Sequence, residues 1–182
     1  MKKISFSSPD IIDSDIQLVE DVIRSGWLTH GKYSTEFEKV FADFTGSKYA
    51  ITVSNCTAGL HLSCMALGIK DGDEVIVPAQ THTATSHAVE LTGARAIFAD
   101  VENITGNIDI VDIKNKITEK TKGIIPVHMA GFPCKMDEIM DLCKENDLFL
   151  IEDCAHGFGT KYSGKHVGNF GATGNFSFYP TK

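Results

Sequence analysis

The sequence lacks the features of several large classes of protein. No cluster of lysine and arginine is dense enough to bind a phosphate backbone, and the formal net charge is -7 at pH 7. No apolar run is long enough to span a membrane, and the amino terminus has no apolar stretch of the kind found in signal peptides. We therefore expect no nucleic-acid partner, no membrane span and a cytoplasmic location.

The number and spacing of the cysteines match neither a disulfide framework nor a zinc site. The chain has five cysteines, an odd number, and no CxxC pair. Because free cysteine behaves as a small buried hydrophobe, we expect reduced and mostly buried thiols. The nucleotide-binding motifs GxGxxG and GxxxxGK[ST] are absent as well, so a dinucleotide or P-loop site is not predicted.

The composition itself is that of a globular domain, with 42% hydrophobic and 23% charged residues in 182 positions. Ser14 begins a capping box, and apolar residues between 16 and 23 recur at helical spacing up to Gly26. Thr35 begins a second pattern of this kind, which Gly46 closes. Two amino-terminal helices are predicted.

From residue 49 onward, short apolar runs alternate with helical patterns. This alternation predicts an α/β fold with a mostly parallel sheet covered by helices, because parallel neighbours need crossover connections. The expected strands are 49–54, 74–77, 94–99, 123–127 and 148–152. The expected helices are 57–67, 83–91, 110–117 and 136–146.

Polar residues follow these strands, at the edge where parallel α/β sheets bind ligands. Asn55, Cys56 and Thr57 lie between a strand and a helix, so the first helical N–H groups could hold an anion such as phosphate. The same residues could equally form a simple helix cap. His128 follows another of the strands.

Asp153 follows an apolar run, and a buried carboxylate needs a positive or hydrogen-bonding partner. It could instead cap a following helix, although Gly157 and Gly159 disfavour a helix there. His82 and His156 are interpreted either as structural or surface residues or as ligands of a metal shared with Asp153. No HxxxH or HxH spacing supports such a site, so no metal is predicted.

The sequence ends on Lys182, directly after aromatic residues with the alternation of a half-buried strand. Most lysines are solvated. A lysine just past a buried strand would instead be desolvated, which favours the neutral amine and allows it to form a Schiff base.

Six segments, in this order, resemble the DegT/DnrJ/EryC1/StrS family of sugar aminotransferases that depend on pyridoxal phosphate (PLP). They are SGWLTHG at 25–31, SNCTAGLHL at 54–62, GDEVIVP at 72–78, IPVH at 125–128, IEDCAH at 151–156 and FSFYPTK at 176–182. The resemblance implies PLP-dependent transferase fold type I. It implies an amino-terminal helical segment, 1–46, packed on a PLP-binding large domain, 47–182, which is incomplete because family members are much longer.

The resemblance also implies roles for individual residues. Lys182 matches the lysine that holds PLP as a Schiff base and then shuttles a proton. Asp153 matches the carboxylate that keeps the pyridine nitrogen protonated.

The other roles that the resemblance implies concern the phosphate, the ring and the substrate of the family's enzymes. Cys56, Thr57 and Ser177 match the phosphate-binding positions, His82 the side chain stacked on the ring, and His156 a residue near the ring hydroxyl. Thr29 matches a segment that approaches the sugar.

The implied reaction passes an amino group, usually from glutamate, to a keto group of a nucleotide-linked deoxysugar, within a homodimer. A lysine at 182 favours transfer over the dehydration that a related branch with histidine performs. Two alternatives stay open: a PLP enzyme of the same fold acting on a non-sugar cyclic ketone, and a non-catalytic regulator or scaffold if the natural chain ends at Lys182.

Overall fold

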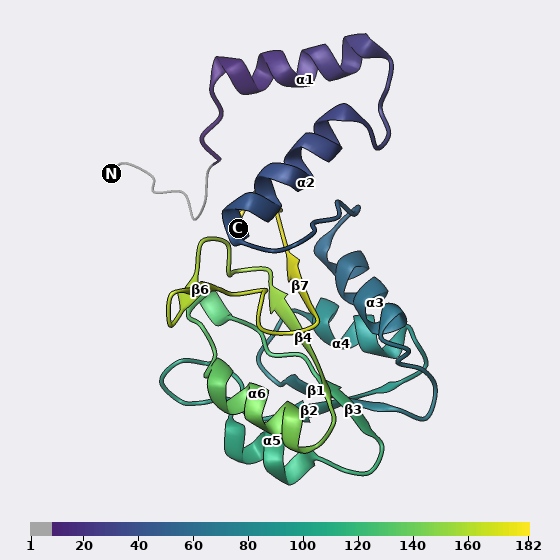
Figure 1. Cartoon of the computed structure of the whole chain (residues 1–182), viewed down its shortest axis with the longest axis vertical. Coiled ribbons are helices and arrows are strands. Elements are labelled where there is room, and N and C mark those ends of the chain that lie inside the picture. The colour runs from purple at the N-terminus through teal and green to yellow at the C-terminus, as the bar shows by residue number, and fades with distance from the viewer. Residues whose placement is uncertain (1–8) are drawn as a thin grey trace, which may run out of the picture. The chain divides into compact units, whose positions relative to one another are not determined.

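A computed structural model describes residues 9–182 of the chain. The described residues form two compact units, one made of residues 9–52 and 179–182 and the other of residues 53–178. Most elements of the two units are labelled in Figure 1. The predicted packing of segment 1–46 on the large domain stays a prediction.

The first unit contains the two predicted amino-terminal helices, α1 (Asp13–Ser25) and α2 (Lys32–Thr45). Both end where the sequence predicts, at Gly26 and Gly46, which have φ values of 71° and 77°. Glycine occurs at such ends because it has no Cβ to clash in the left-handed conformation.

The starts of both helices differ from the capping boxes predicted at Ser14 and Thr35. The N-cap residue of α1 is Ile12, whose backbone N–H donates to the carboxylate of Asp15 at 3.1 Å. The N-cap of α2 is Gly31, ahead of the predicted start. The box at Ser14 is wrong because an acid one turn into the helix satisfies the free N–H group instead.

The second unit is built on a five-stranded sheet of order β2-β1-β3-β4-β7 in which every pair is parallel. The strands are β1 (Glu74–Pro78), β2 (Arg95–Ala99), β3 (Thr121–Ile124), β4 (Phe149–Cys154) and β7 (Thr173–Phe176). A small antiparallel pair, β5 (Lys161–Tyr162) and β6 (Lys165–His166), stands apart from this sheet. The predicted α/β class is confirmed.

The predicted strand at 49–54 is wrong. Tyr49 and Ile51 are 74% and 81% exposed, and no strand of residues 9–182 pairs with this segment. A strand needs a neighbour to satisfy its backbone N–H and C=O groups, so apolar alternation by itself does not make one. The strand-like alternation at the carboxyl end is also displaced, since β7 ends at Phe176.

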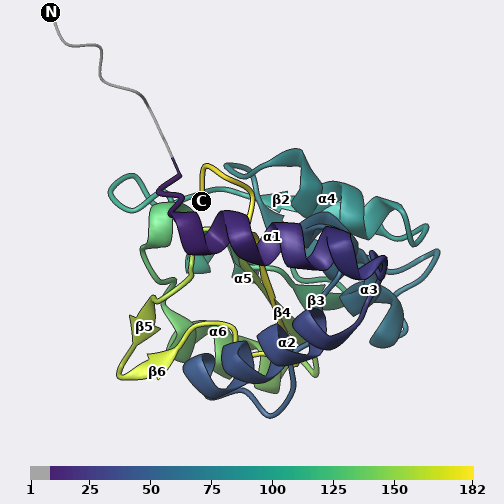
Figure 2. The same ribbon diagram turned by 90° about the horizontal axis from the view of Figure 1, so that it is seen from above.

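Helices cover both faces of the sheet. On one face lie α3 (Cys56–Ala66) and α4 (Thr83–Glu90), next to each other (Figure 2). Val75 and Val77 of β1 pack into the core cluster under α3 and α4, whereas Ile76 between them belongs to the opposite cluster. That opposite cluster includes residues of α5 (Ile110–Lys116) and α6 (Met136–Glu145). Burial on both faces is the usual state of a parallel strand. A short 3₁₀ turn, Met129–Gly131, follows His128.

All five cysteines are free, and four of them are buried, as predicted: Cys64, Cys134, Cys143 and Cys154. Burial raises the pKa of Cys64 to about 11 and the pKa values of Cys134 and Cys143 to about 12, so these thiols stay protonated at neutral pH. Over residues 9–182, no helix combines the length and the apolar character that crossing a membrane requires.

Candidate active site

The carboxyl end of β4 carries the predicted carboxylate, Asp153, which is 3% exposed. One carboxylate oxygen accepts a hydrogen bond from the Thr85 hydroxyl at 2.8 Å, and the other accepts one from the Ala155 N–H at 3.1 Å. Burial raises the pKa of Asp153 above its usual value, although both hydrogen bonds and the nearby His156 and His128 act in the opposite direction. Burial therefore makes the ionised form of this carboxyl less favourable than it would be in water.

Within residues 53–178, Asp153 forms no ion pair with a lysine or an arginine. It also does not cap a helix, because β4 is followed by turns and the β5–β6 hairpin, so that alternative is wrong. A buried carboxylate without a cationic neighbour is costly unless a ligand supplies the charge. A positively charged group of a ligand would suit this position.

The predicted anion site lies at the amino-terminal end of α3, and it stays a prediction. Asn55 caps the helix through its side-chain oxygen, which accepts from Ala58 N–H at 2.9 Å. The N–H of Thr57, in the first turn with Cys56, has no acceptor among the described residues. Helix N-termini bind anions through such N–H groups and the helix dipole. The cap and the anion site are thus compatible with each other.

A close contact between α3 and β7 brings Ser177 to this edge of the sheet. A Cβ at Gly59 would lie 2.8 Å from the side-chain oxygen of Asn175, so glycine permits the approach. Ser63, one turn further along α3, bonds the same oxygen at 3.1 Å. Asn175 is also the register partner of Asp153, and half-buried Ser177 follows it by two residues.

The two candidate histidines of the second unit are exposed, and each has a backbone contact. His82 is the N-cap residue of α4, and its Nδ1 accepts from Ala84 N–H at 3.1 Å. His156 follows β4, and its Nδ1 accepts from Ala130 N–H at 3.2 Å. The hydrogen bond between Thr85 and Asp153 brings the first turn of α4, which carries His82, to the carboxylate.

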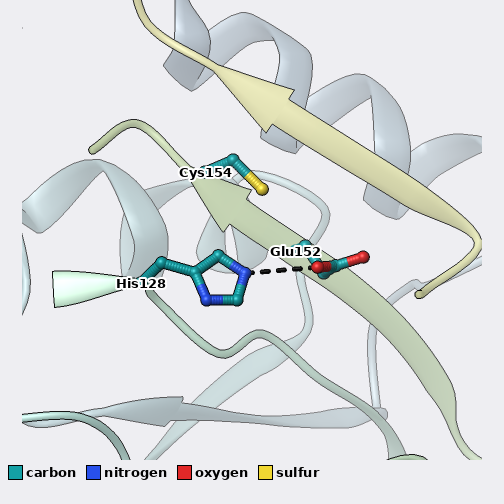
Figure 3. A group of neighbouring side chains, drawn as sticks. All are labelled: His128, Glu152 and Cys154. Atoms are coloured by element: carbon teal, nitrogen blue, oxygen red, sulfur yellow. Dashed lines mark hydrogen bonds and ion pairs between the residues drawn. The ribbon is translucent and has the colours of Figure 1, made fainter. Parts of the chain in front are cut away.

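One group of possible metal ligands lies beside Asp153, namely His128, Glu152 and Cys154, whose donor atoms are within 4.8 Å of one another (Figure 3). His128 Nδ1 accepts from the Cys134 N–H at 3.1 Å, so Nε2 carries the proton that is donated to Glu152 at 3.2 Å. Burial raises the pKa of Cys154 well above its usual value. The imidazole nitrogens are both in use and the thiol is protonated, so this cluster is suited to structural hydrogen bonding rather than to a metal.

Glu152 is the centre of that network. One oxygen accepts from His128 and from the Gly168 N–H, and the other accepts from the N–H groups of Phe170 and Gly171 at 2.7 and 2.8 Å. Burial alone would raise the pKa of Glu152, but these hydrogen bonds together lower it. An ionised Glu152 therefore fastens the loop that leads into β7.

Thr29 and Lys182 belong to the first unit, and both are exposed. The segment around Thr29 is held by its neighbours: Trp27 Nε1 donates to the carbonyl of His30 at 3.0 Å, and His30 Nε2 lies 3.0 Å from Glu38. Bonds from His30 and Thr52 lower the pKa of Glu38 to about 2. The contact between Lys182 and the Asp153 site stays a prediction.

The sequence interpretation gave no role to Thr85 or Asn175, which the fold places against Asp153 and α3. Thr85 is fully buried, although threonine is usually exposed. The one signal that the sequence offers for its role is a hydroxyl near the start of the helix that follows β1. Only the fold shows that it faces β4.

A family model described as the DegT/DnrJ/EryC1/StrS aminotransferase family matches residues 9–182. The chain belongs to this family. The family's enzymes are PLP-dependent. The α/β fold of the chain is that of PLP-dependent aminotransferases, with a parallel sheet flanked by helices.

Among curated relatives, the chain is 46% identical to the GDP-perosamine synthase of Escherichia coli O157:H7, over all of this chain (100%) and 50% of that protein. Among solved structures, it matches the PLP form of Spr1654 from Streptococcus pneumoniae, a candidate sugar aminotransferase, with 34% identity and a TM-score of 0.95 over 100% of this chain and 50% of that one. It also matches 3-amino-5-hydroxybenzoic acid synthase, with 33% identity and a TM-score of 0.90 over 94% of this chain and 45% of that one.

The chain spans about half the length of the curated relatives that it matches, between 45% and 50%. The family assignment therefore applies to the residues present.

Proposed function

We propose that the complete protein is a PLP-dependent aminotransferase that passes an amino group from glutamate to a keto group of a nucleotide-linked deoxysugar. The observation that carries the proposal is the carboxylate of Asp153. It is buried at the strand edge where α/β sheets bind ligands, and it has no cationic partner within residues 53–178. The family assignment supplies the class of reaction.

The residues of the second unit fit PLP. Asp153 would pair with the ring nitrogen, whose positive charge would compensate the burial of the carboxylate. The N–H of Thr57 has no protein acceptor and is suited to a phosphate oxygen, with Cys56 beside it in the first turn of α3. Ser177 lies beyond β7 at the same edge and would complete the phosphate site.

The two histidines would contact the ring of the cofactor. His82 precedes α4, and Thr85 of α4 is hydrogen-bonded to Asp153, so the His82 imidazole is suited to stack on the face of the ring. His156 follows Asp153 by three residues and is exposed, which suits a hydrogen bond to the ring hydroxyl. Both roles rest on the family resemblance of these positions.

When bound, PLP supplies an aldehyde that accepts the amino group and a ring that withdraws electrons. Asp153 would keep the ring nitrogen protonated, which makes the ring a better electron acceptor. The amine of Lys182 would hold the cofactor until an amino donor displaces it, and would then act as the general base and acid at the α carbon of the donor.

The substrate class is inferred from the relatives. The GDP-perosamine synthase to which the chain is similar is named for a nucleotide-linked product. By analogy we infer a nucleotide-linked keto sugar, with Thr29 near it and glutamate as the donor. We further infer a homodimer in the cytoplasm, and light scattering on the complete protein tests the homodimer: a monomer at assay concentrations would contradict it.

The test of the cofactor uses the complete protein. Purified protein should bind PLP and absorb visible light, and borohydride reduction should add the cofactor's mass to the peptide that contains Lys182. Lys182→Ala should lose this adduct and amino transfer, whereas Lys144→Ala, at an exposed position in α6, should keep both. A colourless wild-type protein that takes up no added PLP would overturn the proposal.

A second candidate keeps the cofactor and changes the substrate to a non-sugar cyclic ketone. The similarity to 3-amino-5-hydroxybenzoic acid synthase favours it. Glutamate-dependent amination should be measured on GDP-, UDP- and dTDP-linked keto sugars and on carbocyclic ketones. Turnover of the carbocyclic ketones alone would replace the first candidate with the second.

A further inference from the structure

Asp153 is joined to two threonine hydroxyls in a row. Thr85, in α4, is fully buried, and its Oγ1 lies 2.8 Å from a carboxylate oxygen of Asp153. Thr81, just before α4, places its own Oγ1 2.8 Å from that of Thr85. Both contacts have the length of good O–H···O hydrogen bonds.

The direction of these bonds follows from the number of protons. A hydroxyl group has a single proton to donate, and an ionised carboxylate can only accept. Thr85 therefore donates to Asp153 and has no proton left for Thr81, so Thr81 must donate to Thr85. Hydrogen bonds arranged in one direction polarise one another, so the second hydroxyl strengthens the bond made by the first.

We propose that Thr81 and Thr85 are positioning residues that keep Asp153 an ionised acceptor, aimed at the ring nitrogen of the cofactor. This inference rests on the proposed function. Burial pushes the carboxyl toward its neutral form, and the bond from Thr85 is the largest of the influences that oppose this. The other groups that favour the carboxylate are the Ala155 N–H and the nearby His156 and His128.

The same bond fixes the position of a second cofactor contact. His82 caps α4 three residues before Thr85, so the first turn of α4 carries both the predicted ring-stacking side chain and the hydroxyl that touches Asp153. Loss of the Thr85 hydroxyl would therefore loosen the position of His82, the proposed contact of the ring face, relative to Asp153, the proposed partner of the ring nitrogen. Positioning of this kind matters because small displacements of binding groups weaken catalysis strongly.

The decisive substitution is Thr85→Val in the complete protein, because valine keeps the branched shape and removes the hydroxyl. Thr85→Ser restores the hydroxyl, and Thr81→Val removes only the second one. Ser86→Ala is the matched control, since the Ser86 hydroxyl bonds Thr83 in the same helix and does not reach Asp153.

The first measurement uses the protein without PLP. Carboxyl carbon NMR, assigned with Asp153→Asn, should show a higher pKa for Asp153 in Thr85→Val, a smaller rise in Thr81→Val, and wild-type behaviour in Thr85→Ser and Ser86→Ala. An unchanged titration of Asp153 in a folded Thr85→Val protein would overturn the proposal, as would a failure of serine to restore it.

The second measurement is the dissociation constant of PLP at neutral pH. Loss of a hydrogen bond to a charged group predicts a value about tenfold higher in Thr85→Val, with serine close to wild type. Equal affinities in the valine and serine variants would contradict the proposed role. A wild-type protein that binds no PLP would instead refute the proposed function, and the titration without PLP would still decide the hydroxyl pair.

Discussion

At the scale of single residues, Glu152 is a buried acid whose negative charge is stabilised by several hydrogen-bond donors. Its two oxygens accept bonds from His128 and from three backbone N–H groups, and its side chain is fully buried. Glu152→Gln would turn an NH₂ group toward N–H donors. We expect a loss of about 2–4 kcal/mol in the free energy of unfolding, measured by urea denaturation.

The same residue predicts a dependence on pH. The folded-state pKa of Glu152 is lowered, so its contribution to stability is complete above the unfolded pKa of about 4.3 and is lost as the pH falls through the folded pKa. The glutamine variant should lack this loss on acidification, and the difference between the two proteins should shrink as the pH falls. Parallel stability profiles of the two proteins in acid would contradict the prediction.

At the scale of elements, the contact of α3 with β7 depends on Gly59. An alanine Cβ would meet the Asn175 oxygen at 2.8 Å, and Asn175 is buried and bonded to Ser63, so it cannot simply turn away. Overpacking of this kind costs about 1–3 kcal/mol, whereas alanine in place of glycine gains about 1 kcal/mol in helix propensity.

The sum predicts that Gly59→Ala lowers the free energy of unfolding by about 1 kcal/mol and weakens PLP binding, since α3 carries the proposed phosphate site. Thermal and chemical unfolding would measure the first effect. Adding Asn175→Ser, which shortens the opposing side chain, should restore part of the loss. A Gly59→Ala protein more stable than wild type would show that the close approach is not restrictive.

The elements also show how far the sequence can be interpreted. The strands at Glu74–Pro78 and Phe149–Cys154 were predictable because both of their faces are buried, which produces continuous apolar runs. The segment at 49–54 has the same apolar character without a partner strand, and pairing cannot be read from composition. Helix ends set by glycine were predicted correctly, whereas the helix starts, with Ile12 and Gly31 as N-cap residues, were not.

The candidate site was predictable in the same limited sense. Asp153 was expected because it follows a buried strand. The same rule was applied to Thr57 through a strand at 49–54 that does not form, and Thr57 lies instead in the first turn of α3. The partners Thr85 and Asn175 come from other elements, and only the packing of those elements brings them to the site. Contacts of this kind depend on the tertiary structure and leave no spacing in the sequence.

At the scale of the whole molecule, the two units differ in how much they bury. Of the described residues in 9–52 and 179–182, only Thr45 is buried, whereas the second unit has two extensive core clusters. The apolar stripe of α1, formed by Ile12, Ile16, Val19 and Ile23, is 52–62% exposed. Isolated helices of this length are only marginally stable, so most of the folding stability comes from residues 53–178. The effect of the cofactor should therefore be measured on the unfolding of that unit.

Asp153 links that stability to the cofactor. Burial raises its folded pKa above the unfolded value, so the folded state without PLP loses stability as the pH rises from the unfolded value through the folded one. Asp153→Asn removes this penalty, and asparagine can still accept from Ala155 N–H. At neutral pH the variant without PLP should therefore be at least as stable as wild type in thermal unfolding.

Bound PLP should reverse the order of stability of wild type and Asp153→Asn. A ligand at 100 times its dissociation constant adds about 2.7 kcal/mol to the free energy of unfolding of a protein that binds it only when folded. Asparagine carries no charge to pair with the ring nitrogen, so the rise in Tm on adding PLP should be large in wild type and small in Asp153→Asn. Asp141→Asn, at an exposed position in α6, should respond as wild type does. Equal rises in Tm for wild type and Asp153→Asn would show that the buried carboxylate is not the partner of the cofactor.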